Sequence, residues 1–309
     1  MGLSDGQAYL ALAEYILMIL CLFLSATFSI ILLYNQHKFL YPLSSMLTTY
    51  LCVILVEFAL SAPNVMYMMA FWKKTSPQYN GIIIYYTGIA THIGIIQYEV
   101  TTFFLLMERN VALRFPFSQN KHKYLVLCTF VVGLGTWFPM IPLSLATPIS
   151  ASTKDACWAI NCAVDNFKNG YFIYAKMVLA LVNCCSGTLF VFTLKRHRTT
   201  VNMTQAHAEV GRKGQRSQTV VKMSNTIVMY SFALNLVLDF VPALVDIVVY
   251  RVAQYPLSHY IGPYSRLGSF LGVLFSSAIC FKMMRKSHSN KRFMITTIRI
   301  KDKNNSYHL

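Results

Sequence analysis

Charged residues are scarce in this chain, and acidic residues are the scarcest. Only 12% of the 309 residues are charged, with 27 Lys and Arg against 11 Asp and Glu. A soluble globular protein usually carries about 25% charged residues. Hydrophobic residues make up 55% of the chain and its mean hydropathy is +0.47, so the composition argues against a soluble domain and favours a membrane protein.

Seven apolar stretches fill almost the whole chain. A bilayer core of roughly 30 Å needs about 20 mostly apolar residues in a helix. The stretches cover 8–34, 43–71, 82–107, 124–146, 171–194, 223–250 and 257–281, and a basic tail follows over 282–309. No Lys or Arg precedes the first stretch, and it is longer than the apolar core of a signal peptide, so we expect it to stay in the mature protein. The sequence predicts an all-α membrane protein, a bundle of seven transmembrane helices.

The distribution of Lys and Arg predicts how the bundle lies in the membrane. With the N-terminus outside, the four inner segments hold 20 Lys and Arg and the outer segments hold five. Positive residues concentrate on the cytoplasmic side of membrane proteins. We therefore predict an outer N-terminus and a cytoplasmic C-terminus.

The net charge of +16 does not indicate a nucleic-acid partner. The basic residues are dispersed among short loops beside the apolar stretches, where they also attract anionic inner-leaflet lipids by about 1 kcal/mol per charge. The expected partner of this charge is the lipid bilayer.

Glu108 and Arg109 stand at the inner end of the third stretch, and Pro116 follows seven residues after the Arg. An Arg at a helix end can reach the headgroups or bridge to another helix, while an adjacent carboxylate offsets its charge. We interpret the pair as a latch whose opening would expose a cytoplasmic crevice. The alternative is that Arg109 only anchors the helix at the interface.

Several motifs of the large rhodopsin-like receptor class are missing. The seventh stretch has no Asn-Pro-x-x-Tyr, and it carries no internal Lys for retinal, since Lys282 lies at its end. What the chain resembles is a nematode serpentine chemoreceptor, a seven-transmembrane G-protein-coupled receptor, with a very short N-terminus, Glu-Arg-x-x-Ala at 108–112, Phe-Val-Pro at 240–242 and a short basic tail. The minor class within that superfamily stays open at this point.

The resemblance implies a chemosensory receptor without a cofactor and without enzymatic activity. It implies binding of a small environmental molecule in the outer bundle, activation of a heterotrimeric G protein, and a multi-pass plasma-membrane location on sensory cilia. The inner face offers a basic coupling surface for such a partner, with positive-inside bias as the alternative explanation. Its candidate residues are Glu108, Arg109, Arg114, Arg196 and Arg198.

Ionisable residues inside the stretches are functional candidates, because each costs about 2.5–3.5 kcal/mol to insert. Glu57 and Glu99 lie in the second and third stretches, and we expect structural carboxyl groups rather than a sodium site. In the sixth stretch, Asp239 precedes Pro242, which removes a backbone donor and predicts a kink that could serve as a hinge.

The outer halves of the stretches combine aromatic residues with a few polar anchors, as small-molecule sites do. The candidate ligand-pocket residues are Tyr86, His92, Tyr174, Lys176, Asp246, Tyr264 and Arg266. Asp246 and Arg266 could pair, which would leave Lys176 or His92 for an anionic ligand. The alternative is that the charged residues form a structural pair and that the Tyr residues belong to the interfacial belt.

Cysteine usage predicts no metal site. Cys157 and Cys162 both fall in the second outer loop, where they could form a disulfide, or one could be free. Gly268 and Gly272 permit close approach of another helix, and we expect a helix of the same chain rather than a dimer partner.

Two other function classes remain. A ligand-gated channel or a transporter could use the charged residues as a pathway, but known seven-span channels of insect chemoreception have a cytoplasmic N-terminus, and transporters usually have repeated halves. An intramembrane enzyme would need a catalytic pair. Asp239 and Asp246 are seven residues apart on one helix, about 10 Å, which is too far for a carboxylate dyad.

Overall fold

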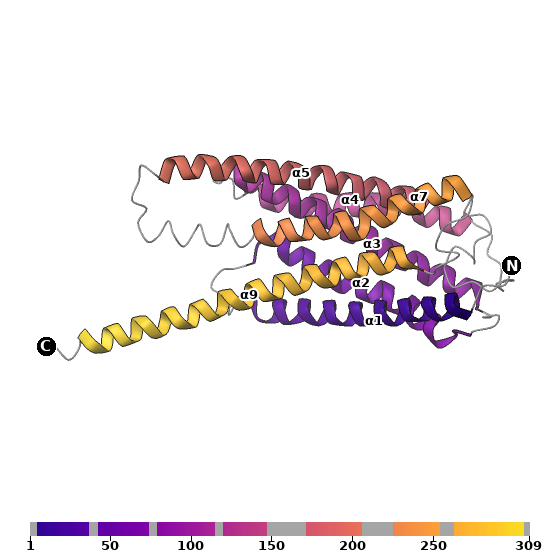
Figure 1. Ribbon diagram of the computed structural model, residues 1–309, viewed down its shortest axis with the longest axis horizontal. Coiled ribbons are helices and arrows are strands. Elements are labelled where there is room, and N and C mark those ends of the chain that lie inside the picture. The colour runs from indigo at the N-terminus through magenta and orange to yellow at the C-terminus, as the bar shows by residue number, and fades with distance from the viewer. Residues whose placement is uncertain are drawn as a thin grey trace.

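The computed structural model describes residues 5–36, 43–73, 79–114, 120–146, 171–205, 225–253 and 263–305. These residues form seven long helical segments in one elongated bundle (Figure 1). The segments are α1 (Asp5–Tyr34), α2 (Ser45–Ala70), α3 (Gly81–Arg114), α4 (Asn120–Ala146), α5 (Tyr171–Gln205), a sixth segment that starts at 225 and continues through η4 (Leu236–Phe240) and α7 (Val241–Ala253), and α9 (Tyr264–Asn305). The structure confirms the predicted all-α fold class.

Six of the helices are long and apolar enough to cross a membrane, and the described apolar part of α4, Tyr124–Phe138, is shorter. Large apolar side chains are exposed on the outside of the bundle, among them Leu20 and Phe23 on α1 and Leu127 and Phe130 on α4. Contiguous exposed apolar surface of this kind suits lipid rather than water. α1 begins at the opposite end of the bundle from the end of α9 (Figure 1).

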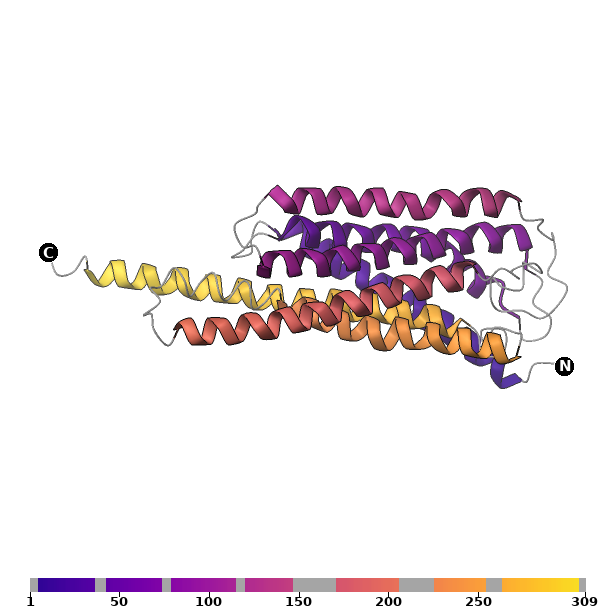
Figure 2. The ribbon, with the colours of Figure 1, turned by 90° about the horizontal axis from the view of Figure 1, so that it is seen from above.

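α3 is the most buried of the six helices and occupies the centre of the bundle. It packs most extensively on α2, and also on α5 and α4. Figure 2 shows α4 along one side of the bundle and α5, α7 and α9 on the other, with α2 and α3 between them. Gly94 of α3 allows this packing: a Cβ there would lie 3.4 Å from the Glu57 backbone, so α2 and α3 approach closely at this point.

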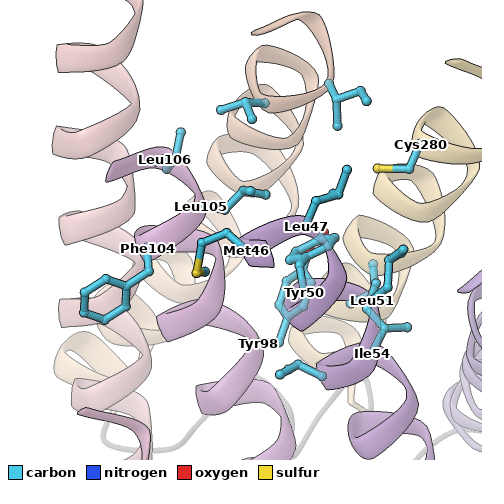
Figure 3. Close-up of a cluster of buried hydrophobic side chains, with 14 of the residues drawn as sticks. Met46, Leu47, Tyr50, Leu51, Ile54, Tyr98, Phe104, Leu105, Leu106 and Cys280 are labelled. Atoms are coloured by element: carbon cyan, nitrogen blue, oxygen red, sulfur yellow. The ribbon is translucent and has the colours of Figure 1, made fainter. Parts of the chain in front are cut away.

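Two apolar clusters form the core. The cluster nearer the C-terminal end of the bundle joins α2, α3 and α9 through Leu47, Tyr50, Tyr98, Leu105 and Cys280 (Figure 3). Within it the hydroxyl oxygens of Tyr50 and Tyr98 are 3.0 Å apart, so two buried polar groups satisfy each other.

The second cluster lies nearer the N-terminus and joins α1, α2, α3 and α9. It includes Tyr15, Met18, Val65, Tyr85 and Phe270. On α2 the polar residues fall between the two clusters: Glu57, Ser61 and Asn64 separate Ile54 from Val65.

Two helices extend further than the apolar pattern indicates. α3 continues to Arg114, so Glu108 and Arg109 lie within a helix rather than at the start of a loop. α9 continues without a break through the basic tail to Asn305 and projects beyond the other helices (Figure 1). A helix needs apolar residues only where it crosses lipid, because polar residues continue the same backbone hydrogen bonds outside it.

The sixth segment contains a π-helical turn that the sequence analysis did not anticipate. The N–H of Val241 bonds to the carbonyl of Leu236, five residues back, immediately before Pro242. A π-turn adds a residue to the helical turn, and such turns concentrate at functional sites. The π-turn η4 lies directly before Pro242, and the kink predicted at this proline stays a prediction.

The irregular turn is packed tightly against α9. A Cβ on Gly268 would lie 2.3 Å from the carbonyl oxygen of Leu238, and one on Gly272 would lie 3.4 Å from the Asp239 carboxylate. The two glycines thus let η4 pack on α9 within one chain, which is the intramolecular contact expected for this spacing.

We predict that Gly268→Ala lowers the thermal unfolding midpoint of the purified protein. The added methyl would overlap a backbone carbonyl that cannot rotate away, and overpacking costs about 1–3 kcal/mol. Gly135→Ala is the matched control, because a Cβ there meets nothing within 4 Å. Equal midpoints for the two variants would contradict the close contact between η4 and α9.

Candidate functional site

The predicted latch residues Glu108 and Arg109 lie near the C-terminal end of α3, and Ser44 at the start of α2 supplies a further partner. Arg109 Nη2 donates to the Glu108 carboxylate at 2.9 Å and to Ser44 Oγ at 2.8 Å. Ser44 Oγ in turn donates to Glu108 at 3.2 Å. The three side chains form a closed group that ties the start of α2 to the C-terminal end of α3.

Ser44 is also the N-cap of α2. Its hydroxyl accepts the backbone N–H of Leu47 at 3.2 Å, which satisfies one of the free donors at the start of the helix. Ser44 was not among the functional candidates predicted from the sequence. A Ser directly before an apolar helical stretch is nevertheless a recognisable capping signal.

The other basic residues of the predicted coupling surface whose side chains are described are exposed. Arg114 is exposed and lies 3.5 Å from Thr193 on α5, and Arg196 is exposed on the same helix. Arg198 lies in α5, but its side chain is outside the described part of the structure. The described residues therefore show Arg109 engaged within the bundle and Arg114 and Arg196 at its surface.

A buried polar group in the middle of the bundle links α3 with α5. The amide of Asn183 donates to the Glu99 carboxylate and, at 3.2 Å, to the Glu99 backbone carbonyl. Both side chains are buried, so the bond offsets part of the cost of burying each, while Glu99 Oε1 and Asn183 Oδ1 have no hydrogen-bond partner in the structure. Glu57 is buried nearby on α2, and neither of its carboxyl oxygens has a hydrogen-bond partner in the structure.

Lys176 connects three helices in the same region. Its Nζ lies 3.8 Å from the Asp239 carboxylate in η4 and donates to Ser265 Oγ at 3.1 Å and Ser269 Oγ at 2.8 Å in α9. It also donates to the Ser265 carbonyl at 3.0 Å. Lys176, predicted for the ligand pocket, and Asp239, predicted for the switch, are therefore one ion pair beside the π-turn and Pro242.

Asp246 and Arg266, which the sequence suggested as a pair, have other partners in the structure. Tyr264 donates to the Asp246 carboxylate at 2.6 Å, while Arg266 donates to Asn64 Oδ1 at 3.3 Å and contacts His92 Nε2 at 3.0 Å. Tyr264 and Arg266 are two residues apart on α9, so their side chains point about 200° apart around the helix. This geometry sends one toward α7 and the other toward α2 and α3.

Two predicted aromatic pocket residues lie away from this group. Tyr86 on α3 is 47% exposed and Tyr174 on α5 is 36% exposed, with the Arg251 guanidinium 5.9 Å above the Tyr174 ring. Both fit the alternative of an interfacial aromatic belt. The predicted cysteine pair, Cys157 and Cys162, lies outside the described residues.

No group of three or more His, Cys, Asp or Glu that could hold a metal ion occurs among the described residues. Sequence reasoning missed Asn64, Asn183, Ser265 and Ser269 because it considered mainly ionisable residues within the spans. Uncharged polar residues in an apolar helix carry the same signal, since each needs a hydrogen-bond partner away from water.

The seven-helix membrane bundle, with the hydrogen-bonded group of Ser44, Glu108 and Arg109 at one end and buried polar groups toward the other, has the architecture of a seven-transmembrane receptor. The family model of the serpentine-type 7TM GPCR chemoreceptors Srbc matches residues 8–288, so the chain belongs to this family. This match confirms the resemblance to serpentine chemoreceptors and resolves the class that the sequence motifs left open. A comparison with curated proteins finds no match.

We predict that Asn183→Leu lowers the thermal midpoint of the purified receptor, because it leaves the buried Glu99 carboxylate without its donor. A hydrogen bond between membrane helices contributes about 0.6 kcal/mol on average, and an unsatisfied buried group costs about 1–3 kcal/mol. Thr188→Val is the matched control on the same helix, since among the described residues Thr188 bonds only to the Cys184 carbonyl of its own helix. A midpoint for Asn183→Leu no lower than that of the control would refute the contribution of this pair.

Proposed function

We propose that this chemoreceptor binds a small environmental molecule between its helices near the N-terminal end and activates a heterotrimeric G protein at the opposite end. The proposal includes an outer N-terminus, a plasma-membrane location and display on a sensory cilium. Its main support is the latch: the family's receptor role requires an inner switch, and Arg109 is held by Ser44 and Glu108 at the inner end of the central helix.

The two ends are far apart, so activation needs a physical connection. His92 and Arg109 both lie on α3 and are separated by about 25 Å of helix. A ligand can shift the receptor only by its different affinity for two states. The connection must therefore be a group that both ends influence and that has two arrangements.

Lys176 and the π-turn η4 have the contacts for this role. Lys176 binds α9 through Ser265 and Ser269 and lies beside Asp239 in η4. A ligand that displaced the start of α9 would disturb these contacts and change the packing of η4. Since η4 lies in the middle of the sixth segment, its rearrangement would move the inner half of that segment.

The inner half of the sixth segment packs against α5 at a close contact. A Cβ on Gly187 would lie 1.9 Å from the Phe232 ring, so the ring sits directly on the α5 backbone. On α3, the Asn110 amide reaches the Ser186 carbonyl of α5 at 3.5 Å. Movement of the sixth segment would thus be transmitted to α5 and to the end of α3 that carries the latch.

Arg109→Ala should reduce the ligand-stimulated increase in G-protein activation by roughly tenfold while surface display stays near that of the parent, because without the Arg the latch is already open before ligand binds, and a coupling of 1–3 kcal/mol corresponds to about 5–150-fold. The measurement is a G-protein reporter in cells challenged with environmental extracts fractionated by charge and polarity. Arg285→Ala, which removes an exposed Arg of α9, is the control and should retain signalling. Parental signalling by Arg109→Ala would remove the latch from the mechanism, and a current that persists with G proteins blocked would favour a channel.

Ser44→Ala should raise basal signalling several-fold, because the closed latch loses a hydrogen bond to a charged group, worth about 1.5–3 kcal/mol. The loss of the N-cap also costs about 1 kcal/mol of stability, so signalling is normalised to surface display. Ser44→Thr keeps the hydroxyl and should stay near the parent, as should Ser45→Ala at the exposed neighbouring position. Equal basal activity in Ser44→Ala and Ser45→Ala would show that Ser44 does not hold the resting state.

A further inference from the structure

Arg266 extends from the first turn of α9 to two other helices. Its Nη1 donates to Asn64 Oδ1 on α2 at 3.3 Å, and its Nη2 lies 3.0 Å from His92 Nε2 on α3. A guanidinium group can only donate, so His92 Nε2 is the acceptor of this bond. The cation therefore lies between three helices with two uncharged partners.

A short chain of hydrogen bonds fixes this arrangement. Thr87 Oγ1 donates to the Ile83 carbonyl at 2.6 Å, and the same oxygen accepts the Asn64 amide nitrogen at 2.9 Å. The Asn64 amide nitrogen is thereby directed to Thr87 and its oxygen to Arg266. Thr87 and Asn64 together hold the guanidinium in one position, as a preorganised binding group requires.

The described carboxylates of this part of the bundle do not neutralise Arg266. Asp239 pairs with Lys176, and Asp246 accepts the hydroxyl of Tyr264. Glu14 is buried on α1, and its Oε2 has no hydrogen-bond partner in the structure. Among the residues that the structure describes, no carboxylate forms an ion pair with Arg266, although charges within membrane proteins are normally paired.

The guanidinium also keeps room for a further partner. Its contacts with Asn64 and His92 account for two of its five N–H donors. Arg266 and His92 are both only partly buried, although they lie between helices, so part of their surface remains accessible. A planar guanidinium with free donors matches the two oxygens of a carboxylate.

We propose that Arg266 is the anchor of an anion subsite, and that the ligands of this receptor are small organic acids bound through their carboxylate. This inference rests on the proposed ligand-binding function and names the ligand class. Asn64 and His92 are positioning residues that orient the guanidinium. The pairing of Lys176 with Asp239 makes Arg266, rather than Lys176, the cation for the ligand.

The probes are sodium salts of monocarboxylic acids from acetate to octanoate, with benzoate, each compared with its methyl ester. Thermal unfolding of the full-length receptor in lipid nanodiscs measures binding directly. At a concentration about ten times the dissociation constant, a bound acid should raise the midpoint by roughly 3 °C, and the ester should not. If no acid stabilises the receptor more than its methyl ester does, the proposed subsite is overturned.

Two variants of Arg266 and one control variant test the role of this residue. Arg266→Gln should abolish the acid-dependent shift, whereas Arg251→Gln, which removes an exposed Arg near Tyr174, should retain it. Without acid, Arg266→Gln should unfold at or above the parental midpoint, because it removes an uncompensated charge. A midpoint several degrees lower would indicate a structural Arg and contradict the proposal. Arg266→Lys keeps the charge without the planar fork, and should retain only part of the shift.

Further measurements distinguish an organic acid from an inorganic anion, and the anion subsite from the proposed G-protein coupling. An equal shift with sodium chloride or phosphate, lost in Arg266→Gln, would show an inorganic anion site and overturn the organic-acid assignment. Acid-dependent stabilisation without G-protein activation would uphold the subsite and count against the proposed coupling. G-protein activation by neutral molecules that survives Arg266→Gln would uphold the coupling and overturn the subsite.

Discussion

The absence of water from the bilayer core is the constraint on which the rest of this structure depends. It forces the backbone into helices that satisfy their own hydrogen bonds, and it requires polar side chains to find partners on neighbouring helices. Glu99 with Asn183, and Tyr50 with Tyr98, are such pairs. Each pair fixes which faces of two helices meet, so a few polar residues specify the packing of a largely apolar bundle.

Close backbone contacts also determine how the helices pack. Between helices surrounded by lipid, apolar side chains gain little from burial, and small residues that admit close approach favour association. Gly268 brings the carbonyl of Leu238 against α9, and Gly94 brings the backbone of Glu57 against α3. Both contacts lie next to functional candidates, so the tight packing also positions Asp239 in η4 and the carboxyl of Glu57.

The cations within the bundle differ in how their charge is compensated. Arg109 is neutralised by Glu108 beside it, and Lys176 is neutralised by Asp239. Arg266 has only uncharged partners among the described residues. A cation that is already compensated suits a latch or a structural junction, whereas an uncompensated one suits recognition of a ligand that brings the opposite charge.

The sequence by itself determined the class of protein, because apolar length depends only on residues that are consecutive in the chain. It also located Glu108 and Arg109, since neighbouring residues on one helix keep their relation in any tertiary arrangement. Partners on other helices depend on rotation and crossing of those helices, which no local pattern encodes. Only the tertiary structure could therefore join Ser44 to Arg109, direct Tyr264 rather than Arg266 to Asp246, and leave Arg266 with Asn64 and His92.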